Sequence, residues 1–98
     1  NINSKFSLSL LANNVGLTES YLSRLFKLET NVNLIHYINL QKLEKAKEQL
    51  LVKNCSVKNL SYELGFDVAT YFNRLFSRTY LISPTEYINL VNQLTIIN

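Results

Sequence analysis

Two six-residue stretches decide the fold of this chain: "YLSRLF" (residues 21–26) and "YFNRLF" (residues 71–76). They lie at the same place in two longer blocks that align along their whole length, "LANNVGLTESYLSRLFKLETNVNLIHYIN" and "LSYELGFDVATYFNRLFSRTYLISPTEYIN". Arg24 and Arg74 therefore occupy equivalent positions. Two copies are too few to stack as a solenoid, and the segment between them is not a third copy. The sequence predicts an internal duplication.

Each block carries the boundary signals of two helices joined by a tight turn. In the first block Ser7 can cap a helix that runs to about Asn13, Gly16 supplies a left-handed residue after it, and Thr18 can cap the next helix. The equivalent residues of the second block are Ser56, Gly65 and Asp67. The second block has one extra residue just after its glycine. Each block is therefore predicted to fold as helix, turn, helix.

Small residues indicate how the two helices of each block cross. Ala12 and Ser61 occur at the same position, in the first helix and shortly before the glycine. Helices that cross steeply need small side chains where their backbones approach each other. This favours a helix-turn-helix unit over a hairpin of two parallel-packed helices.

The segment between the blocks is predicted to be one long amphipathic helix, from about residue 34 to about residue 53. It lacks Gly and Pro, and it has an apolar stripe at helical spacing. At a rise of about 1.5 Å per residue, such a helix spans roughly 30 Å. The stripe consists of Leu40, Leu43, Ala46 and Leu50.

A last helix is predicted from about residue 84 to about residue 94. It starts at "SPTE", where Ser83 can cap, Pro84 can take the first helical position and Glu86 can complete a capping box.

The second helix of each block has an apolar face and a polar face built around one arginine. Apart from the arginine and Lys27, the polar side chains are short, so such a helix can lie close to base edges in the major groove of DNA. Arg can bind guanine through two hydrogen bonds, and Asn can pair with adenine. The alternative is that each polar face is simply solvated. Because the polar face occurs twice with an arginine at the same place, we favour the interpretation that it contacts DNA. The polar faces consist of Ser20, Ser23, Arg24 and Lys27, and of Thr70, Asn73, Arg74 and Ser77.

Composition restricts the other functions. The chain has 98 residues, 47% of them hydrophobic, and a formal net charge of +3, which permits an anionic partner without demanding one. Cys55 is the only cysteine and His36 the only histidine, so the chain can form neither an internal disulfide nor a cysteine-based or histidine-based metal site. We interpret Cys55 as a tolerated thiol and His36 as a neighbour of solvent or phosphate. No catalytic constellation was found, so we expect no enzyme activity and no cofactor.

The combined pattern resembles the DNA-binding domain of AraC/XylS transcription regulators. The resemblance covers nearly the whole chain and rests on "LANNVGLTESYLSRLFKLET", "KLEKAKEQLL", "LSYELGFDVATYFNRLF" and "ISPTEY". It implies an all-α, homeodomain-like fold in which a long helix joins two helix-turn-helix units. It also implies that the helices holding Arg24 and Arg74 enter successive major grooves. The linker length agrees, since one turn of B-DNA is about 34 Å.

The resemblance also implies which residues contact DNA. The family's base-contacting positions fall on Ser20, Ser23 and Arg24 in the first unit, and on Ala69, Thr70, Asn73 and Arg74 in the second. Basic and hydroxyl side chains near these helices are candidates for phosphate contacts. They are Lys27, Lys58, Ser77 and Arg78, with Lys5 and Lys53 as further basic candidates.

The chain departs from the family pattern at several positions. Family members usually have Gly at the positions of Asn31 and Leu81, and Arg at those of Lys42 and Ile88. Asn can adopt a left-handed turn, whereas Leu cannot do so cheaply. We therefore expect the loop after the helix that holds Arg74 to be rebuilt relative to the family pattern. The family's opening helix is also expected to be absent or shortened.

These observations give one set of expectations. Residues 1–98 are expected to form a single DNA-binding domain, with helix-turn-helix units at about 7–29 and 56–79. Double-stranded DNA is the expected partner, and the alternative is a helical protein-interaction module. The resemblance allows RNA polymerase as a second partner, and a regulatory or dimerisation domain elsewhere in the parent chain. A bacterial, cytoplasmic location near the nucleoid is expected.

Overall fold

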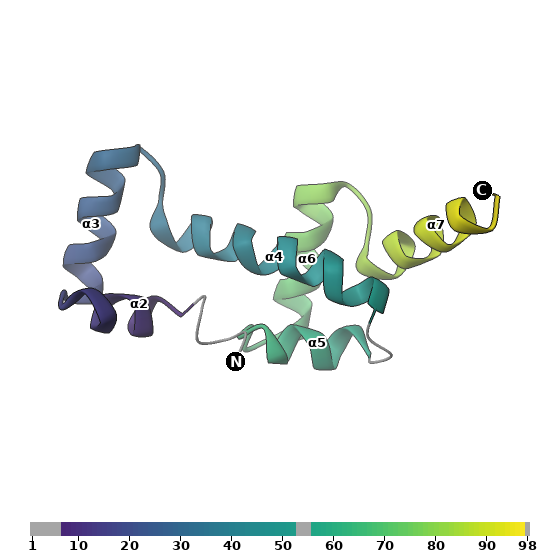
Figure 1. Ribbon diagram of the computed structural model, residues 1–98, viewed down its shortest axis with the longest axis horizontal. Helices are drawn as coiled ribbons and strands as arrows, with labels where there is room; N and C mark the ends of the chain where they lie inside the picture. The colour runs from purple at the N-terminus through teal and green to yellow at the C-terminus, as the bar shows by residue number, and fades with distance from the viewer. Residues whose placement is uncertain (1–6, 53–55, 98) are drawn as a thin grey trace. The chain divides into compact units, whose positions relative to one another are not determined.

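The protein is described by a computed structural model that places residues 7–52 and 56–97. Within these ranges it is entirely helical, which confirms the predicted fold class (Figure 1). The chain divides into two compact units, unit 1 (residues 1–44) and unit 2 (residues 45–98). The helices are α2 (Leu8–Val15), α3 (Glu19–Thr30), α4 (Leu34–Val52), α5 (Val57–Glu63), α6 (Ala69–Tyr80) and α7 (Pro84–Ile97).

The boundaries of α2 and α3 are set by the residues predicted to set them. The Ser7 hydroxyl accepts a hydrogen bond from the Leu10 amide at 3.3 Å, so Ser7 caps α2. Gly16 follows α2 in the left-handed conformation, with φ of 73°. The Thr18 hydroxyl accepts a hydrogen bond from the Tyr21 amide at 3.1 Å. The helix-turn-helix prediction is therefore confirmed in unit 1.

The start of α6 corrects one prediction. Ser56 caps α5 as expected, but Asp67 does not cap α6. Val68 takes the cap position, and its side chain makes no capping hydrogen bond because it has no polar atom. The extra residue after Gly65 shifts the start of the helix by one position past the aspartate. As a result α3 has a side-chain cap and α6 has none.

The residue after α6 corrects a second prediction. Leu81 adopts the left-handed conformation, with φ of 71° and ψ of 5°, close to the φ of 61° and ψ of 22° of Asn31 after α3. The amide of each residue donates a hydrogen bond of 2.8 Å to the carbonyl four residues earlier. The loop is therefore not rebuilt. It keeps the geometry of unit 1 at the cost of backbone strain in a leucine.

The long helix α4 starts at the predicted residue, whereas α7 runs three residues past its predicted end near residue 94. Leu43, Ala46 and Leu50 of α4 are buried, while Leu40 is only partly covered. Asn33, the residue before α4, was not among the predicted caps, and its Oδ1 accepts a hydrogen bond from the His36 amide at 3.0 Å.

A capping box starts α7 as predicted. The Ser83 amide donates to Glu86 Oε1 at 2.8 Å, and the Glu86 amide donates to the Ser83 hydroxyl at 3.1 Å. These bonds lower the pKa of Glu86 below its ordinary value of 4.5, chiefly through the bond from the Ser83 backbone.

Unit 2 has a closed aromatic core. Phe72 and Phe76 of α6 are fully buried, with ring centroids 5.9 Å apart. The ring centroid of Phe76 also lies 4.8 Å from that of Tyr80 and 5.9 Å from that of Tyr87 in α7. Such tilted and edge-on pairs add to the free energy of area burial. Lys47 of α4 covers the outer ring, with Nζ 4.3 Å from the Tyr80 centroid.

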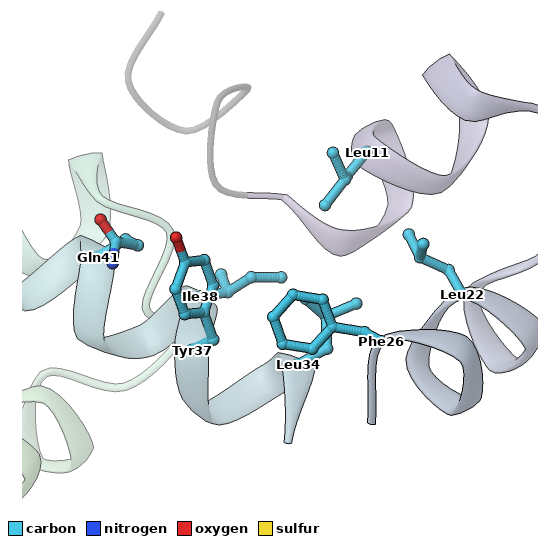
Figure 2. Close-up of a pocket in the computed structure, with 7 residues that line it drawn as sticks. All are labelled: Leu11, Leu22, Phe26, Leu34, Tyr37, Ile38 and Gln41. Atoms are coloured by element: carbon cyan, nitrogen blue, oxygen red, sulfur yellow. The ribbon is translucent and has the colours of Figure 1, made fainter. Parts of the chain in front are cut away.

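Unit 1 is less completely packed. No residue of α3 is buried, and the equivalents of the two central phenylalanines, Leu22 and Phe26, are only partly covered. Both line an apolar cavity of about 300 Å³ (Figure 2). The ring centroids of Phe26 and Tyr37 lie 5.4 Å apart. The other lining residues are Leu11, Leu34, Tyr37, Ile38 and Gln41.

Candidate nucleic-acid interface

The predicted base-contacting residues of unit 1 lie together on α3. Ser20, Ser23 and Arg24 line one shallow hollow of about 370 Å³. Ser20 and Arg24 are exposed, and Ser23 is half-buried. Leu22 and Phe26 of the same helix line the cavity of the unit (Figure 2). Helical phase therefore puts Ser20, Ser23 and Arg24 on another face of α3. The hollow is also lined by Glu19 and by two apolar residues, Leu8 and Ile35, none of which was predicted to contact a base.

Arg24 contacts an aromatic ring that the sequence analysis did not connect with it. Its Cζ lies 6.0 Å from the centroid of the Tyr21 ring, within the range of a cation–π interaction. Tyr21 is 48% exposed. A signal was present in the sequence, since residues three apart are neighbours on a helix surface.

Lys27, a predicted phosphate contact, lies at the other end of α3. Its Nζ donates a hydrogen bond of 3.3 Å to the carbonyl of Asn31. A cation at the C-terminus of a helix also complements the helix dipole. The lysine is exposed and here helps to end the helix.

The equivalent face of unit 2 belongs to α6. Thr70, Asn73 and Arg74 are exposed, and Ala69 is half-buried. Phe72, Leu75 and Phe76 form the buried face of the same helix, as the helical phase of the sequence predicted. The apolar face of α6 is thus packed in the core of unit 2, while the polar face of the helix is exposed.

The remaining candidates are distributed around unit 2. Lys58 of α5 and Arg78 of α6 are exposed, whereas Ser77 is half-buried. Lys5, Lys53 and Cys55 lie outside the described residues.

The described residues offer no metal site and no membrane-spanning helix. Residues 7–52 and 56–97 contain no group of three or more His, Cys, Asp or Glu side chains that could hold a metal ion. His36 is exposed on α4. None of the helices placed in these ranges is long and apolar enough to span a membrane.

Two helix-turn-helix units with exposed arginine-centred faces define a class of DNA-binding proteins. The sequence model of a family described as "Helix-turn-helix domain" matches residues 11–89. The chain belongs to this family, in its AraC type, and its members are DNA-binding regulators of transcription.

Curated relatives and solved structures agree with this assignment. The chain is 30% identical over 83 residues to the regulatory protein PocR of Salmonella typhimurium, and 33% identical over 88 residues to the HTH-type transcriptional activator RhaR of Mannheimia succiniciproducens. It is 31% identical to the C-terminal domain of the two-component response regulator yesN from Fusobacterium nucleatum. That match has a TM-score of 0.72 and covers 89% of this chain and 84% of the other.

The matched region is a small part of the full-length relatives. It covers 85% of this chain but 27% of PocR, and 88% of this chain but 31% of RhaR. The similarity to these two relatives therefore concerns about a third of their length or less.

Proposed function

We propose that this domain binds double-stranded DNA sequence-specifically by placing α3 and α6 in two successive major grooves. One observation carries the proposal. The second helix of each helix-turn-helix unit presents an exposed arginine, Arg24 or Arg74, on a face of short polar side chains. This is the geometry by which a recognition helix approaches base edges.

The base contacts are proposed for Ser20, Ser23 and Arg24 on α3, and for Ala69, Thr70, Asn73 and Arg74 on α6. Their exposure supports this assignment, except that Ser23 and Ala69 are half-buried. Short side chains allow close approach of the helix, while each arginine can bind one guanine bidentately.

The phosphate contacts are proposed for Lys27, Lys58, Ser77 and Arg78. Such contacts fix the position of a protein on the duplex without carrying sequence information. Their contribution to affinity falls as the salt concentration rises.

The biological setting is part of the proposal. We propose that residues 1–98 act as one DNA-binding domain in the bacterial cytoplasm, without catalytic activity. We further propose that a regulatory or dimerisation domain of the same protein controls it, and that RNA polymerase is a second partner. The short share of PocR and RhaR that the chain covers supports a further domain in the parent protein.

The experiment is a selection of bound sequences from randomised duplexes, followed by a salt titration on the selected site. Binding should weaken with a linear dependence of log K on log salt, with a slope of about 0.9 per phosphate neutralised. Arg24→Ala and Arg74→Ala should each cost about 1 to 3 kcal/mol and each relax the preference at one position. The two positions should lie about one helical turn apart.

Arg78→Ala is the matched control, because it removes the same charge from a proposed phosphate contact. It should weaken all duplexes by a similar factor and leave the base preferences unchanged. If no duplex binds, the helical interaction module becomes the better interpretation. Unchanged preferences in both Arg24→Ala and Arg74→Ala would show that the recognition faces are assigned wrongly.

A further inference from the structure

We propose that Tyr21 is a positioning residue that holds the Arg24 guanidinium in place and thereby sharpens its choice of base. The inference rests on the proposed function, since it concerns how one of the two arginines discriminates between base pairs. It adds a specificity-determining residue that does not itself contact a base.

The geometry brings the ring and the guanidinium together on α3. Tyr21 precedes Arg24 by three positions, a spacing that makes their side chains neighbours on the helix surface. The Arg24 Cζ lies 6.0 Å from the ring centroid. The Tyr21 amide donates its hydrogen bond to the Thr18 hydroxyl, so the turn that carries the ring is fixed by the helix cap.

Exposure leaves the ring available for this role. Tyr21 is 48% exposed and Arg24 is also exposed, so their contact lies at the surface. A hydroxyl group on an exposed ring can contact phosphate as well, so the ring and the hydroxyl have to be tested separately.

Ordering the arginine matters because its side chain is long and flexible. A bidentate hydrogen bond to guanine requires the guanidinium plane to match the O6 and N7 edge of the base. An aromatic face that attracts the guanidinium reduces the number of conformers that the free protein must give up on binding. This gain in binding free energy is realised only when the base offers the matching edge. The contact with the ring therefore increases discrimination between guanine and the other bases.

The equivalent tyrosine of unit 2 is placed against the core. The Tyr71 ring lies 6.1 Å from the ring of Phe66, which is buried. A substitution of Tyr71 would therefore change packing as well as the surface. Tyr71 at 46% and Tyr62 at 44% are both about as exposed as Tyr21. Tyr62 is the better control because it lies on α5, outside both proposed recognition helices.

The experiment compares Tyr21→Leu, Tyr21→Phe and Tyr62→Leu with the parent by selection from randomised duplexes. Arg24→Ala and Arg74→Ala, measured in parallel, identify the position that each arginine contacts. Tyr21→Leu should reduce the preference at the Arg24 position by about two- to five-fold, the value of an exposed cation–π contact. The Arg74 position should keep its preference, and both Tyr21→Phe and Tyr62→Leu should behave as the parent does.

Several results would overturn the inference, and they separate it from the proposed function. If Arg24→Ala changes one position and Tyr21→Leu does not, the inference is wrong and the proposed function stands. If Tyr21→Phe loses as much as Tyr21→Leu, the hydroxyl acts directly and the ring does not position the arginine. Equal losses of preference at the Arg24 and Arg74 positions would show that Tyr21 does not act on Arg24 specifically, and would overturn the inference. If Arg24→Ala changes no position, Arg24 is not a base contact, and both the recognition face of α3 and the role of Tyr21 are wrong.

Discussion

Replacing Leu81 by asparagine should stabilise the protein. Leu81 follows α6 in the left-handed conformation, with φ of 71°, and its side chain is 85% exposed. Unit 1 has Asn31 at the equivalent position with nearly the same backbone angles and the same amide hydrogen bond. The asparagine can therefore be accommodated without any change of the loop.

The magnitude follows from strain and burial. A left-handed backbone costs an L-residue other than Gly or Asn roughly 1 to 2 kcal/mol. The exchange gives up little apolar burial, on the order of a few tenths of a kcal/mol, because the leucine is mostly exposed. The net gain in the free energy of unfolding should be about 0.5 to 1 kcal/mol. For a chain of this length that raises Tm by about 2 to 8 °C.

Thermal and urea unfolding would measure the change, with two matched variants. Asn31→Leu makes the reverse exchange in unit 1 and should destabilise by a similar amount. Leu28→Asn changes an equally exposed leucine within α3 and should cost about 0.5 kcal/mol through helix propensity. If Leu81→Asn is no more stable than the parent, or if Leu28→Asn stabilises as much, strain at Leu81 is not the cause.

Three further predictions concern packing, capping and pH. Phe76→Ala should lower the free energy of unfolding, measured in urea, by about 3 to 5 kcal/mol, because Phe76 is fully buried. Phe26→Ala should lower it clearly less, because Phe26 lines a cavity. Equal losses in the two variants would contradict this difference in packing. Val68→Ser should supply the missing cap of α6 and add about 1 kcal/mol, and an unchanged Tm would show that the cap is not limiting. The lowered pKa of Glu86 means that its contribution to stability is present above about pH 4.5 and is lost as the pH falls through the folded-state pKa. The Tm difference between the parent and Glu86→Ala should therefore shrink below that pH, and a constant difference would contradict the capping role.

The local structure of the chain could largely be predicted from its sequence, because it depends on residues close in sequence. The caps at Ser7, Thr18 and Ser56 and the capping box at Glu86 involve partners three positions away, so their spacing was sufficient. The buried face of α6 followed from helical phase.

Two predictions were wrong, the cap at Asp67 and the rebuilt loop at Leu81. In both places the conformation differs from the one that the local residue prefers. Asp67 is a good capping residue, but the extra residue after Gly65 puts Val68 at the start of α6. Leucine disfavours the left-handed conformation, yet Leu81 adopts it after α6, where its amide donates a hydrogen bond to the Ser77 carbonyl.

Contacts between side chains were the hardest part of the candidate site to predict. The exposed polar faces followed from phase, but the hollow beside α3 depends on where Leu8 and Ile35 of the neighbouring helices lie. The proximity of Tyr21 and Arg24 depends on side-chain conformation, which helical spacing permits without fixing.

The unequal cores of the two units have a consequence for hydrogen exchange. The amides of α6 lie on a helix whose Phe72 and Phe76 are fully buried, so they should exchange only through opening of the whole aromatic cluster. The amides of α3 belong to a helix with no buried residue, so smaller local openings should expose them. The two recognition helices would then differ in protection by orders of magnitude, although their sequences are copies of one pattern. DNA binding should slow exchange in α3 far more than in α6.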